Sequence, residues 1–436
     1  MFDYDESVNY LLSIPLFGKK DGNKNVKALI EELNIDITGD RFKFIHVAGT
    51  NGKGSVCTML SYILTESKVK TGLFTSPHLE KINERIKINN NDIEDDELAH
   101  CFNIVKKAIE NIIEKGYLHP TYFETLFVLA LYYFINNNTE IIVLETGIGG
   151  RLDATNVIEK PIVSIITHIG LDHVHILGET LEKIAEEKGG IIKNNIPAVL
   201  STEDKGVLNV INRICKKNNS RLYEVEPVKY SISERTDKTI DFSIYNKYYS
   251  YDGLILNTSA EYQIINLATV LTSLETIKNI IQIDENSIKE GINKFYWPGR
   301  MELIDGWLML DGAHNVSAMR MLVSNMNKNF SSYKITLMFA SMKDKDWEGM
   351  IKELSKCNNI DKVIVSKMNI PRCQEPLALV KCFEKYGFKD ITIEEDYKKI
   401  AKAHNKDIEG VLCVAGSLYL VGEIKKIIKE VKNDSI

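Results

Sequence analysis

The stretch HVAGTNGKGSV, His46 to Val56, decides how the rest of the chain is interpreted. A standard phosphate-binding loop is spelled G-x-x-x-x-G-K-[ST], with the hydroxyl residue directly after the lysine. Here the first two glycines stand too close together for that pattern, and Gly54 separates Lys53 from Ser55. The stretch is either an accident of composition or a different loop for the same chemistry.

The flanks of this stretch favour the second interpretation. Phe42 to Val47 predicts a strand, and Ser55 to Ser67 predicts a helix. A strand, a glycine-rich turn and a helix point backbone N–H groups and a helix dipole at a phosphate. Lys53 would then reach the outer phosphates, and the Ser55 hydroxyl would lie near a magnesium ion. The alternative is a plain turn in which the glycines serve only the backbone and Lys53 is solvated.

Composition restricts what this loop can belong to. The chain has 436 residues, which suits two or three domains with substantial cores. With 44% hydrophobic and 26% charged residues it is typical of a globular protein. A net charge of -6 gives no electrostatic reason to expect nucleic acid or an anionic membrane as a partner. We therefore expect small-molecule partners.

Cysteines and the chain start indicate the compartment. The seven cysteines are scattered, with no C-x-x-C pair, which predicts buried free thiols in a reducing cytosol. The start, MFDYDESVNY, lacks the basic end and apolar stretch of a signal peptide. The longest apolar run, Leu126 to Ile135, is about half as long as a membrane span. The sequence predicts a cytoplasmic protein.

The first two-thirds of the chain alternate predicted strands and helices. Glu140 to Leu144 and Ile162 to Thr167 predict further buried strands, and alternation of this kind indicates a mostly parallel sheet. The spacing of Thr121-Tyr-Phe-Glu124 predicts a capping box that opens a long buried helix. The polar, partly alternating stretch 222–256 predicts a small antiparallel excursion.

A break near Trp297-Pro-Gly-Arg300 divides the chain. After it, further strands followed by helical patterns are predicted at Trp307–Asp311, Lys334–Phe339, Lys362–Ser366, Ile391–Ile393 and Val411–Val414. The predicted fold class is therefore α/β. A P-loop-containing domain with a mostly parallel sheet spans 1–296, and a smaller Rossmann-like α/β domain spans 297–436.

LETGIGGRLDATN, residues 144–156, follows the second predicted strand. Glu145 stands at the carboxyl end of that strand, across from a phosphate loop, where magnesium is usually held. The alternative, a dinucleotide fingerprint at Gly147-x-Gly149-Gly150, fails because the third glycine is misplaced and no helical pattern follows.

Several motifs along the chain resemble, in the same order, those of the folylpolyglutamate synthase/dihydrofolate synthase family, the folate branch of the Mur ligase superfamily. The matching stretches are GTNGKGS (49–55), TSPHL (75–79), ETGIGGRLDATN (145–156), GLDHVHILG (170–178), EKGGIIK (187–193), PGR (298–300), DGAHN (311–315), FASMKDKD (339–346) and AGSLYLVGE (415–423). The helix EYQIINLA (261–268) departs from the family pattern H-Q-x-x-N-A, with Tyr262 for the histidine and Leu267 for the alanine.

The resemblance implies a metal site for magnesium, as a pair of ions, held by Ser76, Glu145, His173 and a carbamylated Lys188. Carbamylation turns an ammonium into an anionic oxygen ligand, whereas unmodified Lys188 would repel the ion. Without the resemblance, Lys188 is a solvated cation and His173 a hydrogen-bonding loop histidine. The role of His175 is open.

The resemblance also assigns the substrates of an enzyme. ATP would be bound by Gly49, Thr50, Asn51, Gly52, Lys53, Gly54, Ser55, Asn266, Arg300 and Asp311. The pterin-bearing substrate would contact Thr121, Phe123, Leu152, Asp153 and Ala154. Catalytic roles fall to Lys53, Lys188 and His314, the last of which would meet the transferred phosphoryl group or the incoming amino acid. Purely structural roles are the alternatives to ligand binding: a helix cap at Thr121, a plain linker at 298–300 and a helix cap at Asn315.

The implied reaction is ATP-dependent ligation through an acyl phosphate. In this family, folylpolyglutamate synthases add L-glutamate to the tail of a reduced folate, often through its γ-carboxylate, and dihydrofolate synthases add it to dihydropteroate. We expect the first activity with the second beside it, in a monomer. Alternatives are dihydrofolate synthase alone, another Mur-type ligase, for whose UDP-sugar domain the about 45 residues before the loop are too few, and a non-catalytic ATP-binding module.

Overall fold

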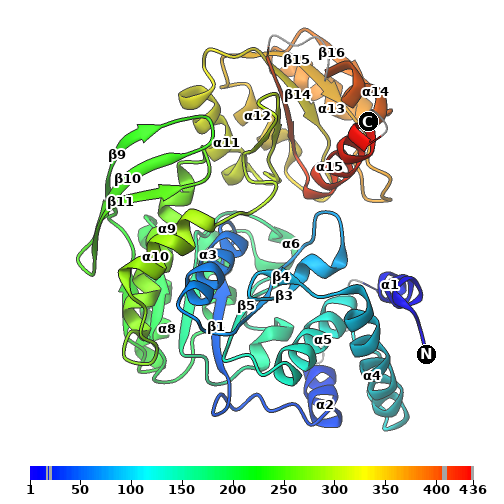
Figure 1. Cartoon of the computed structure of the whole chain (residues 1–436). Helices are drawn as coiled ribbons and strands as arrows, with labels where there is room; N and C mark the ends of the chain where they lie inside the picture. Colours follow the sequence, from blue (N-terminus) through cyan, green and yellow to red (C-terminus); the bar gives the residue numbers. More distant parts are fainter. Residues whose placement is uncertain (16–17, 19–21, 405–409, 434–436) are drawn as a thin grey trace.

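The computed structural model describes residues 1–15, 18, 22–404 and 410–433. Its two lobes are stacked in Figure 1, the first below in blue to green and the second above in yellow to red. The first lobe is built on an eight-stranded sheet of order β4-β3-β2-β5-β1-β6-β7-β8, in which only β3 runs against the other strands and pairs antiparallel with β2 and β4. Its strands are β1 (Lys43–Ala48), β2 (Thr71–Phe74), β3 (Ile86–Ile88), β4 (Asn91–Asp92), β5 (Ile141–Glu145), β6 (Val163–Ile166), β7 (Ala198–Leu200) and β8 (Leu222–Glu224).

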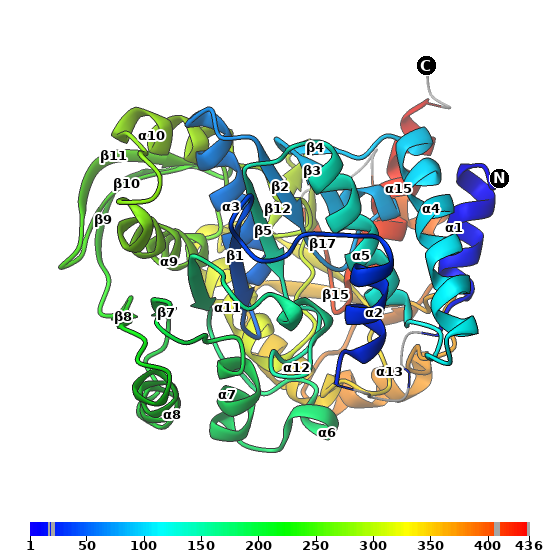
Figure 2. The same ribbon diagram turned by 90° about the horizontal axis from the view of Figure 1, so that it is seen from below.

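Successive side chains of the central strand β1 pack alternately into two hydrophobic cores, one on each face of the sheet. Phe44 packs on one face of the sheet, and Ile45 and Val47 pack on the other. The first face is covered by α1 (Tyr4–Ser13), α2 (Lys24–Glu32), α4 (Asp95–Glu114) and α5 (Tyr122–Asn136). The second is covered by α3 (Lys53–Glu66), α9 (Tyr262–Ile277) and α10 (Glu285–Lys294), as Figure 2 shows. The predicted mostly parallel sheet is confirmed, and helices cover both of its faces.

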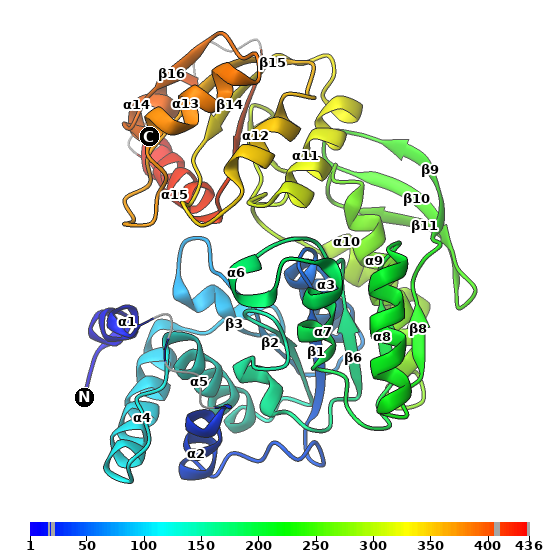
Figure 3. The ribbon, with the colours of Figure 1, turned by 180° about the vertical axis from the view of Figure 1, so that it is seen from behind.

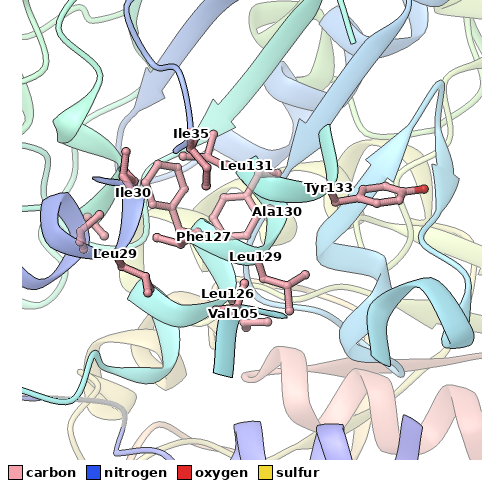
Figure 4. Close-up of a cluster of buried hydrophobic side chains, with 14 of the residues drawn as sticks. Leu29, Ile30, Ile35, Val105, Leu126, Phe127, Leu129, Ala130, Leu131 and Tyr133 are labelled. Atoms are coloured by element: carbon pink, nitrogen blue, oxygen red, sulfur yellow. The ribbon is translucent and has the colours of Figure 1, made fainter. Parts of the chain in front are cut away.

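Helix α5 begins as the sequence predicts. The Thr121 side chain accepts from the Glu124 N–H, and the Glu124 carboxylate accepts from the Thr121 N–H at 2.7 Å. The helix then buries most of its side chains, and Figure 4 shows several of them, with Leu29 and Ile30 of α2, in one apolar cluster. The same cap leaves Thr121 beside the cavity described below.

A three-stranded antiparallel sheet, β11-β10-β9, packs beside α10 and contributes to the core on the second face. Its strands are β9 (Lys229–Arg235), β10 (Ile240–Tyr245) and β11 (Ser250–Leu256). The excursion expected over 222–256 begins later, because residues 222–224 form β8, which pairs in parallel with β7 at the edge of the main sheet. An edge strand is solvated along one side, so a polar composition does not separate it from the excursion.

The remaining helices of the first lobe lie beside β6 and β7. Helices α7 (Leu181–Gly189) and α8 (Lys205–Lys217) pack together in Figure 3 around a core that includes Ile166, Ile184 and Ile211. The short helix α6 (Val174–Leu177) and the 3-10 helices η1 (Ile82–Arg85) and η2 (Ala154–Val157) follow strands of the main sheet. Residues 295–301 lead from α10 to the second lobe.

The second lobe contains a six-stranded sheet of order β12-β13-β17-β14-β15-β16, parallel except for β12. Its strands are β12 (Glu302–Ile304), β13 (Leu308–Leu310), β14 (Ile335–Phe339), β15 (Ile360–Val365), β16 (Ile391–Ile393) and β17 (Val411–Ala415). Helices α11 (Val316–Asn329), α12 (Trp347–Leu354) and α13 (Pro376–Lys385) cover one face, and α14 (Tyr397–His404) and α15 (Leu418–Asn433) the other. The five strands predicted after the break are confirmed within two residues at each end.

All seven cysteines are buried and free, as their scatter along the chain predicts. Among the described helices, none combines the length and the apolar character that crossing a membrane requires.

Candidate active site

A cavity of about 1080 Å³ lies between the two lobes. Its first-lobe wall is formed by loops that follow β1, β2, β5 and β6, together with α7 and α9. The carboxyl ends of parallel strands meet at one edge of a sheet, and ligands bind there in open α/β folds. Every residue that the sequence analysis assigned to ATP, metal, pterin or catalysis lines this cavity. His175 does not line it and is exposed.

Glycines of the phosphate loop are required by close packing. A Cβ on Gly49 would lie 1.8 Å from Thr167 Oγ1, and one on Gly52 would lie 2.4 Å from Asn266 Oδ1. Gly52 also has a φ of +90°, which side chains rarely adopt. The Lys53 ammonium donates to the carbonyls of Gly49 and Thr50, at 3.1 and 3.2 Å. The loop is therefore closely packed around its own lysine.

The unusual spelling of the loop, with Gly54 between Lys53 and Ser55, has a structural reason. A Cβ on Gly54 would lie 2.7 Å from Cζ2 of Trp297, whose ring packs against the core beneath the loop. A serine or threonine directly after Lys53 would meet the same ring. The linker between the lobes therefore occupies the space that the standard loop gives to its hydroxyl residue.

A hydrogen-bonded chain connects the loop to α9. Gln263 Nε2 donates to Ser55 Oγ at 3.2 Å, and Asn266 Nδ2 donates to Gln263 Oε1 at 2.8 Å. Gln263 is buried, and sequence reasoning gave it no role. The signal was its spacing: residues three apart on a helix share a face, so Gln263 had to lie beside Asn266.

Glu145 and Ser76 form the part of the candidate metal site that offers oxygen ligands, a carboxylate and a hydroxyl. Glu145 is 3% exposed, and its Oε2 accepts from the Ser76 N–H at 2.9 Å. Burial raises the pKa of Glu145, and the positive charge of Lys53 opposes that rise. A buried carboxylate facing a phosphate loop supplies the oxygen donor that magnesium prefers, with waters and phosphates completing the shell. These two residues fit such an ion.

Lys188 and His173 fit a metal only under a further condition. The Lys188 ammonium, which is 4% exposed, donates to the Gly49 carbonyl at 2.7 Å. His173 Nε2 lies 3.4 Å from the Lys345 ammonium, and burial together with that charge lowers the pKa of His173 to about 4. His173 thus offers a neutral nitrogen, whereas Lys188 becomes a ligand only if carbamylated. The described residues hold no group of three His, Cys, Asp or Glu side chains able to bind a metal.

Asp172 joins the two lobes across the cavity. Its Oδ1 accepts from the Lys345 ammonium at 2.5 Å, and its Oδ2 accepts from Asn315 Nδ2 at 3.3 Å and lies 3.7 Å from His314 Nε2. Burial alone would raise the pKa of Asp172, but His314 and Lys345 hold it well below its usual range. Sequence reasoning missed Asp172 and Lys345, although both stand inside the motifs 170–178 and 339–346.

Asp311 and Arg300 lie at the start of the second lobe. The Asp311 carboxylate accepts from the N–H groups of Met301 and Ala313, at 2.9 and 2.8 Å, and from the Tyr262 hydroxyl at 3.3 Å. Tyr262, which replaces the histidine of the resembled pattern, thus reaches across from α9. A Cβ on residue 312 would lie 2.2 Å from Arg300 Nη1, so this glycine leaves room for the guanidinium.

The wall expected to hold the pterin is mostly apolar. A Cβ on Gly147 would lie 2.8 Å from the Phe123 ring, and Leu152 is 39% exposed toward the cavity that it lines. Asp153 differs from this apolar surface, because its carboxylate accepts from the Ile148 N–H at 3.0 Å and from the Thr155 hydroxyl at 2.6 Å. Asp153 therefore holds its own loop in shape besides lining the cavity.

Family models match both lobes. Residues 47–281 match the Mur ligase middle domain, and residues 299–418 match the Mur ligase glutamate ligase domain. The fold and the site thus define a Mur ligase, an ATP-dependent ligase.

Comparison with individual proteins shows which branch of the Mur ligases the chain is similar to. The chain is 31% identical to the dihydrofolate synthase/folylpolyglutamate synthase of Bacillus subtilis, over 98% of this chain and 99% of that protein. The solved folylpolyglutamate synthase of Thermotoga maritima is 29% identical, with a TM-score of 0.84 and coverage of 98% and 96%. Escherichia coli FolC in complex with DHPP and ADP is 25% identical, with a TM-score of 0.85 and 99% coverage of both chains. The chain belongs to the folylpolyglutamate synthase/dihydrofolate synthase family.

Proposed function

We propose that this enzyme uses ATP to join L-glutamate to the carboxylate of a reduced folate, and also to dihydropteroate. The observation that carries the proposal is the meeting of the phosphate loop, the Glu145–Ser76 pair and an apolar wall in one cavity between two lobes. The Bacillus subtilis relative is named for both activities, and the FolC structure contains ADP and DHPP, which supports a nucleotide and a second small molecule in the same cleft.

The chemistry requires activation, because a carboxylate oxygen is a poor leaving group. The acceptor carboxylate attacks the γ-phosphorus of ATP, and ADP leaves. The glutamate amine then attacks the acyl carbon, loses a proton and expels phosphate. Phosphoryl transfer depends on positioning and charge neutralisation. Lys53, the loop N–H groups and Arg300 would supply both, since these residues line the cavity.

Glu145 and Ser76 would hold magnesium, which when bound neutralises phosphate charge. His173 and a carbamylated Lys188 would hold a second ion. Carbamylation requires a neutral amine, which attacks carbon dioxide and loses a proton. Burial, together with the nearby positive charge of Lys53, lowers the pKa of Lys188 to about 7, so a large neutral fraction exists near neutral pH.

His314 is proposed to meet the transferred phosphoryl group or the incoming amino acid. Its Nδ1 lies 2.8 Å from the Gly312 carbonyl, which can only accept, so Nδ1 carries a proton and Nε2 faces the cavity side near Asp172. A ring fixed in this way presents one nitrogen to the substrates.

We further propose that residues 1–296 and 297–436 are the two units that close on ATP, in a cytoplasmic monomer. Closure would exclude water from the acyl phosphate, which is prone to hydrolysis. The hydrogen bonds that Asp172 and Asn315 make between the lobes support closure at this cavity.

The test is ATP-dependent incorporation of labelled glutamate, measured separately with dihydropteroate and with a reduced folate. Incorporation with both acceptors is expected. Activity with dihydropteroate alone would remove the folate assignment, and no incorporation with either would remove the activity.

Lys53→Ala should reduce kcat about 100- to 1000-fold, because it removes a donor to charge that develops in phosphoryl transfer. The midpoint of thermal unfolding is the control, since the Lys53 ammonium bonds only within its own loop among the described residues. A near-normal rate in a folded variant would contradict the loop assignment.

A further inference from the structure

Arg85 is a buried cation on the acceptor side of the cavity. It ends η1, is 7% exposed and lines the cavity. Its carbonyl accepts from the Thr75 N–H at 3.0 Å, which fixes the residue beside the end of β2. An arginine between a loop and a strand is ordinarily a surface charge, whereas this one is buried.

The contacts of Arg85 use only part of its guanidinium. Nε donates to His78 Nδ1 at 2.8 Å, and the guanidinium carbon lies 5.3 Å from the centre of the Tyr122 ring. Within the described part of the chain, no carboxylate lies within 4 Å of Arg85 to form an ion pair. The N–H groups at the tip of the side chain are therefore left for something that enters the cavity.

A buried cation without an anionic partner is unfavourable, because it has lost water and gained no opposite charge. Glu145 acts on the same region electrostatically but lies beyond ion-pair distance of Arg85. The planar fork of an arginine matches a carboxylate, which it binds through two parallel hydrogen bonds. The geometry therefore calls for a ligand carboxylate next to Tyr122.

The two proposed acceptors differ in this group. Dihydropteroate has one carboxylate, the one that reacts, whereas a reduced folate ends in glutamate and has a second one. The reacting carboxylate is a nucleophile, and a bidentate arginine pair would occupy the oxygen lone pairs that must attack phosphorus. The unreactive carboxylate has no such restriction.

We propose that Arg85 binds the unreactive α-carboxylate of a folate acceptor and so determines how well the enzyme uses folates relative to dihydropteroate. This inference rests on the proposed function. A purely structural role, in which Arg85 only supports His78 and Tyr122, would affect both acceptors alike.

The experiment compares wild type, Arg85→Gln and Arg85→Lys, with KM and kcat measured for each acceptor at saturating ATP and glutamate. Lys81→Gln is the matched control, because Lys81 loses the same charge nearby, with a side chain that is 64% exposed and does not line the cavity. A hydrogen bond to a charged group accounts for about a 10- to 100-fold difference in affinity. We expect the ratio of KM for folate to KM for dihydropteroate to rise by that factor in Arg85→Gln, less in Arg85→Lys, and not in Lys81→Gln.

A second measurement uses a folate whose α-carboxylate is an amide. Wild type should bind it about 10- to 100-fold more weakly than the folate, and Arg85→Gln should no longer distinguish the two. Equal changes for both acceptors in Arg85→Gln would overturn the inference, as would a wild type that accepts the amide as well as the folate. The amide result stands even if Arg85→Gln does not fold. Failure of the proposed function is distinguishable, because wild type would then incorporate no glutamate.

Discussion

Lys188 is the residue whose chemistry depends most on its surroundings. An exposed lysine stays charged at neutral pH, whereas burial against the phosphate loop, with the charge of Lys53, lowers the pKa of Lys188 to about 7. If its carbamate holds a metal ion, removing dissolved carbon dioxide should lower kcat about 10- to 100-fold, and bicarbonate should restore it. Lys188→Arg should be slow at any bicarbonate concentration, and Lys183→Arg, a change on the exposed side of the same helix, should behave as wild type.

A spectroscopic measurement separates carbamylation of Lys188 from an indirect effect of bicarbonate on the rate. Protein supplied with ¹³C-labelled carbon dioxide should show a carbamate carbon resonance that Lys188→Arg lacks. Wild type without that resonance, and with activity indifferent to bicarbonate, would contradict the modification.

His46 predicts an acid-sensitive fold. The Thr155 hydroxyl donates to Asp153, so His46 Nε2, 2.8 Å away, must donate to Thr155. The ring is buried and its Nδ1 has no partner among the described residues, and burial lowers the pKa of His46 from 6.5 to about 3. Below pH 6.5 the His46 ring is therefore protonated in the unfolded chain, whereas the buried ring of the folded chain stays neutral. This contribution to stability is complete above pH 6.5 and falls by about 2 kcal/mol at pH 5.

The measurement is the unfolding midpoint at pH 7 and at pH 5. His46→Gln keeps a donor for Thr155 but does not titrate, so its midpoint should be lower at pH 7 and should drop less between the two values. Identical drops in wild type and variant would show that other groups account for the acid sensitivity.

At the scale of single elements, the sequence predicts most of the structure that depends on neighbouring residues. The strand, loop and helix over 42–67 and the capping box at Thr121 depend on residues within a few positions of one another, so they were predicted nearly to the residue. The pairing of 222–224 was not, because an edge strand and an antiparallel excursion can have the same composition. The reason for Gly54 could not be predicted either, since its neighbour Trp297 is far away in the chain.

The contact of Gly54 with Trp297 gives a reciprocal test. Alanine is favoured over glycine inside a helix by about 1 kcal/mol, so Gly54→Ala would stabilise α3 if the ring were absent. With the ring present, the added methyl group should displace the loop and raise KM for ATP about tenfold. Trp297→Leu in the same chain should recover much of that loss, a coupling expected only for residues in contact.

Steady-state KM for ATP and the unfolding midpoint of the four chains of this cycle provide the check. Trp297→Phe serves as the conservative control, because a narrower ring keeps the apolar contact. Additive effects of Gly54→Ala and Trp297→Leu would show that the ring does not set the position of the loop.

At the scale of the whole molecule, the candidate active site is an assembly of loops from two lobes. The resemblance indicated which residues to expect at this site, and the order of parallel strands explains why the first-lobe residues meet at one edge. The contacts between lobes could not be derived in that way. Asp172 pairs with Lys345, 173 positions later, and no local pattern in either stretch specifies the partner.

Asn315 gives the sharpest test of closure, because its two functions can be separated. Its Oδ1 caps α11 by accepting from the Ala318 N–H at 2.9 Å, and it also accepts from Asn51 Nδ2 at 3.3 Å. Its Nδ2 donates across the cavity to Asn51 Oδ1 at 2.9 Å and to Asp172 Oδ2 at 3.3 Å. Serine caps a helix as well as asparagine does but has no amide to donate. Asn315→Ser should therefore remove the two hydrogen bonds that Nδ2 donates between the lobes and keep the cap, whereas Asn315→Ala removes these bonds and the cap.

We expect Asn315→Ser to unfold at nearly the wild-type midpoint and to raise KM for ATP about tenfold, since each hydrogen bond lost contributes about 1 kcal/mol. Small-angle scattering with a non-hydrolysable ATP analogue should show a more open molecule than wild type. Asn315→Ala should add a loss of about 1 kcal/mol in the stability of the second lobe. If Asn315→Ser closes and binds ATP as wild type does, the lobes are held by other contacts and Asn315 is only a cap. The phosphate loop would then be positioned without help from the second lobe.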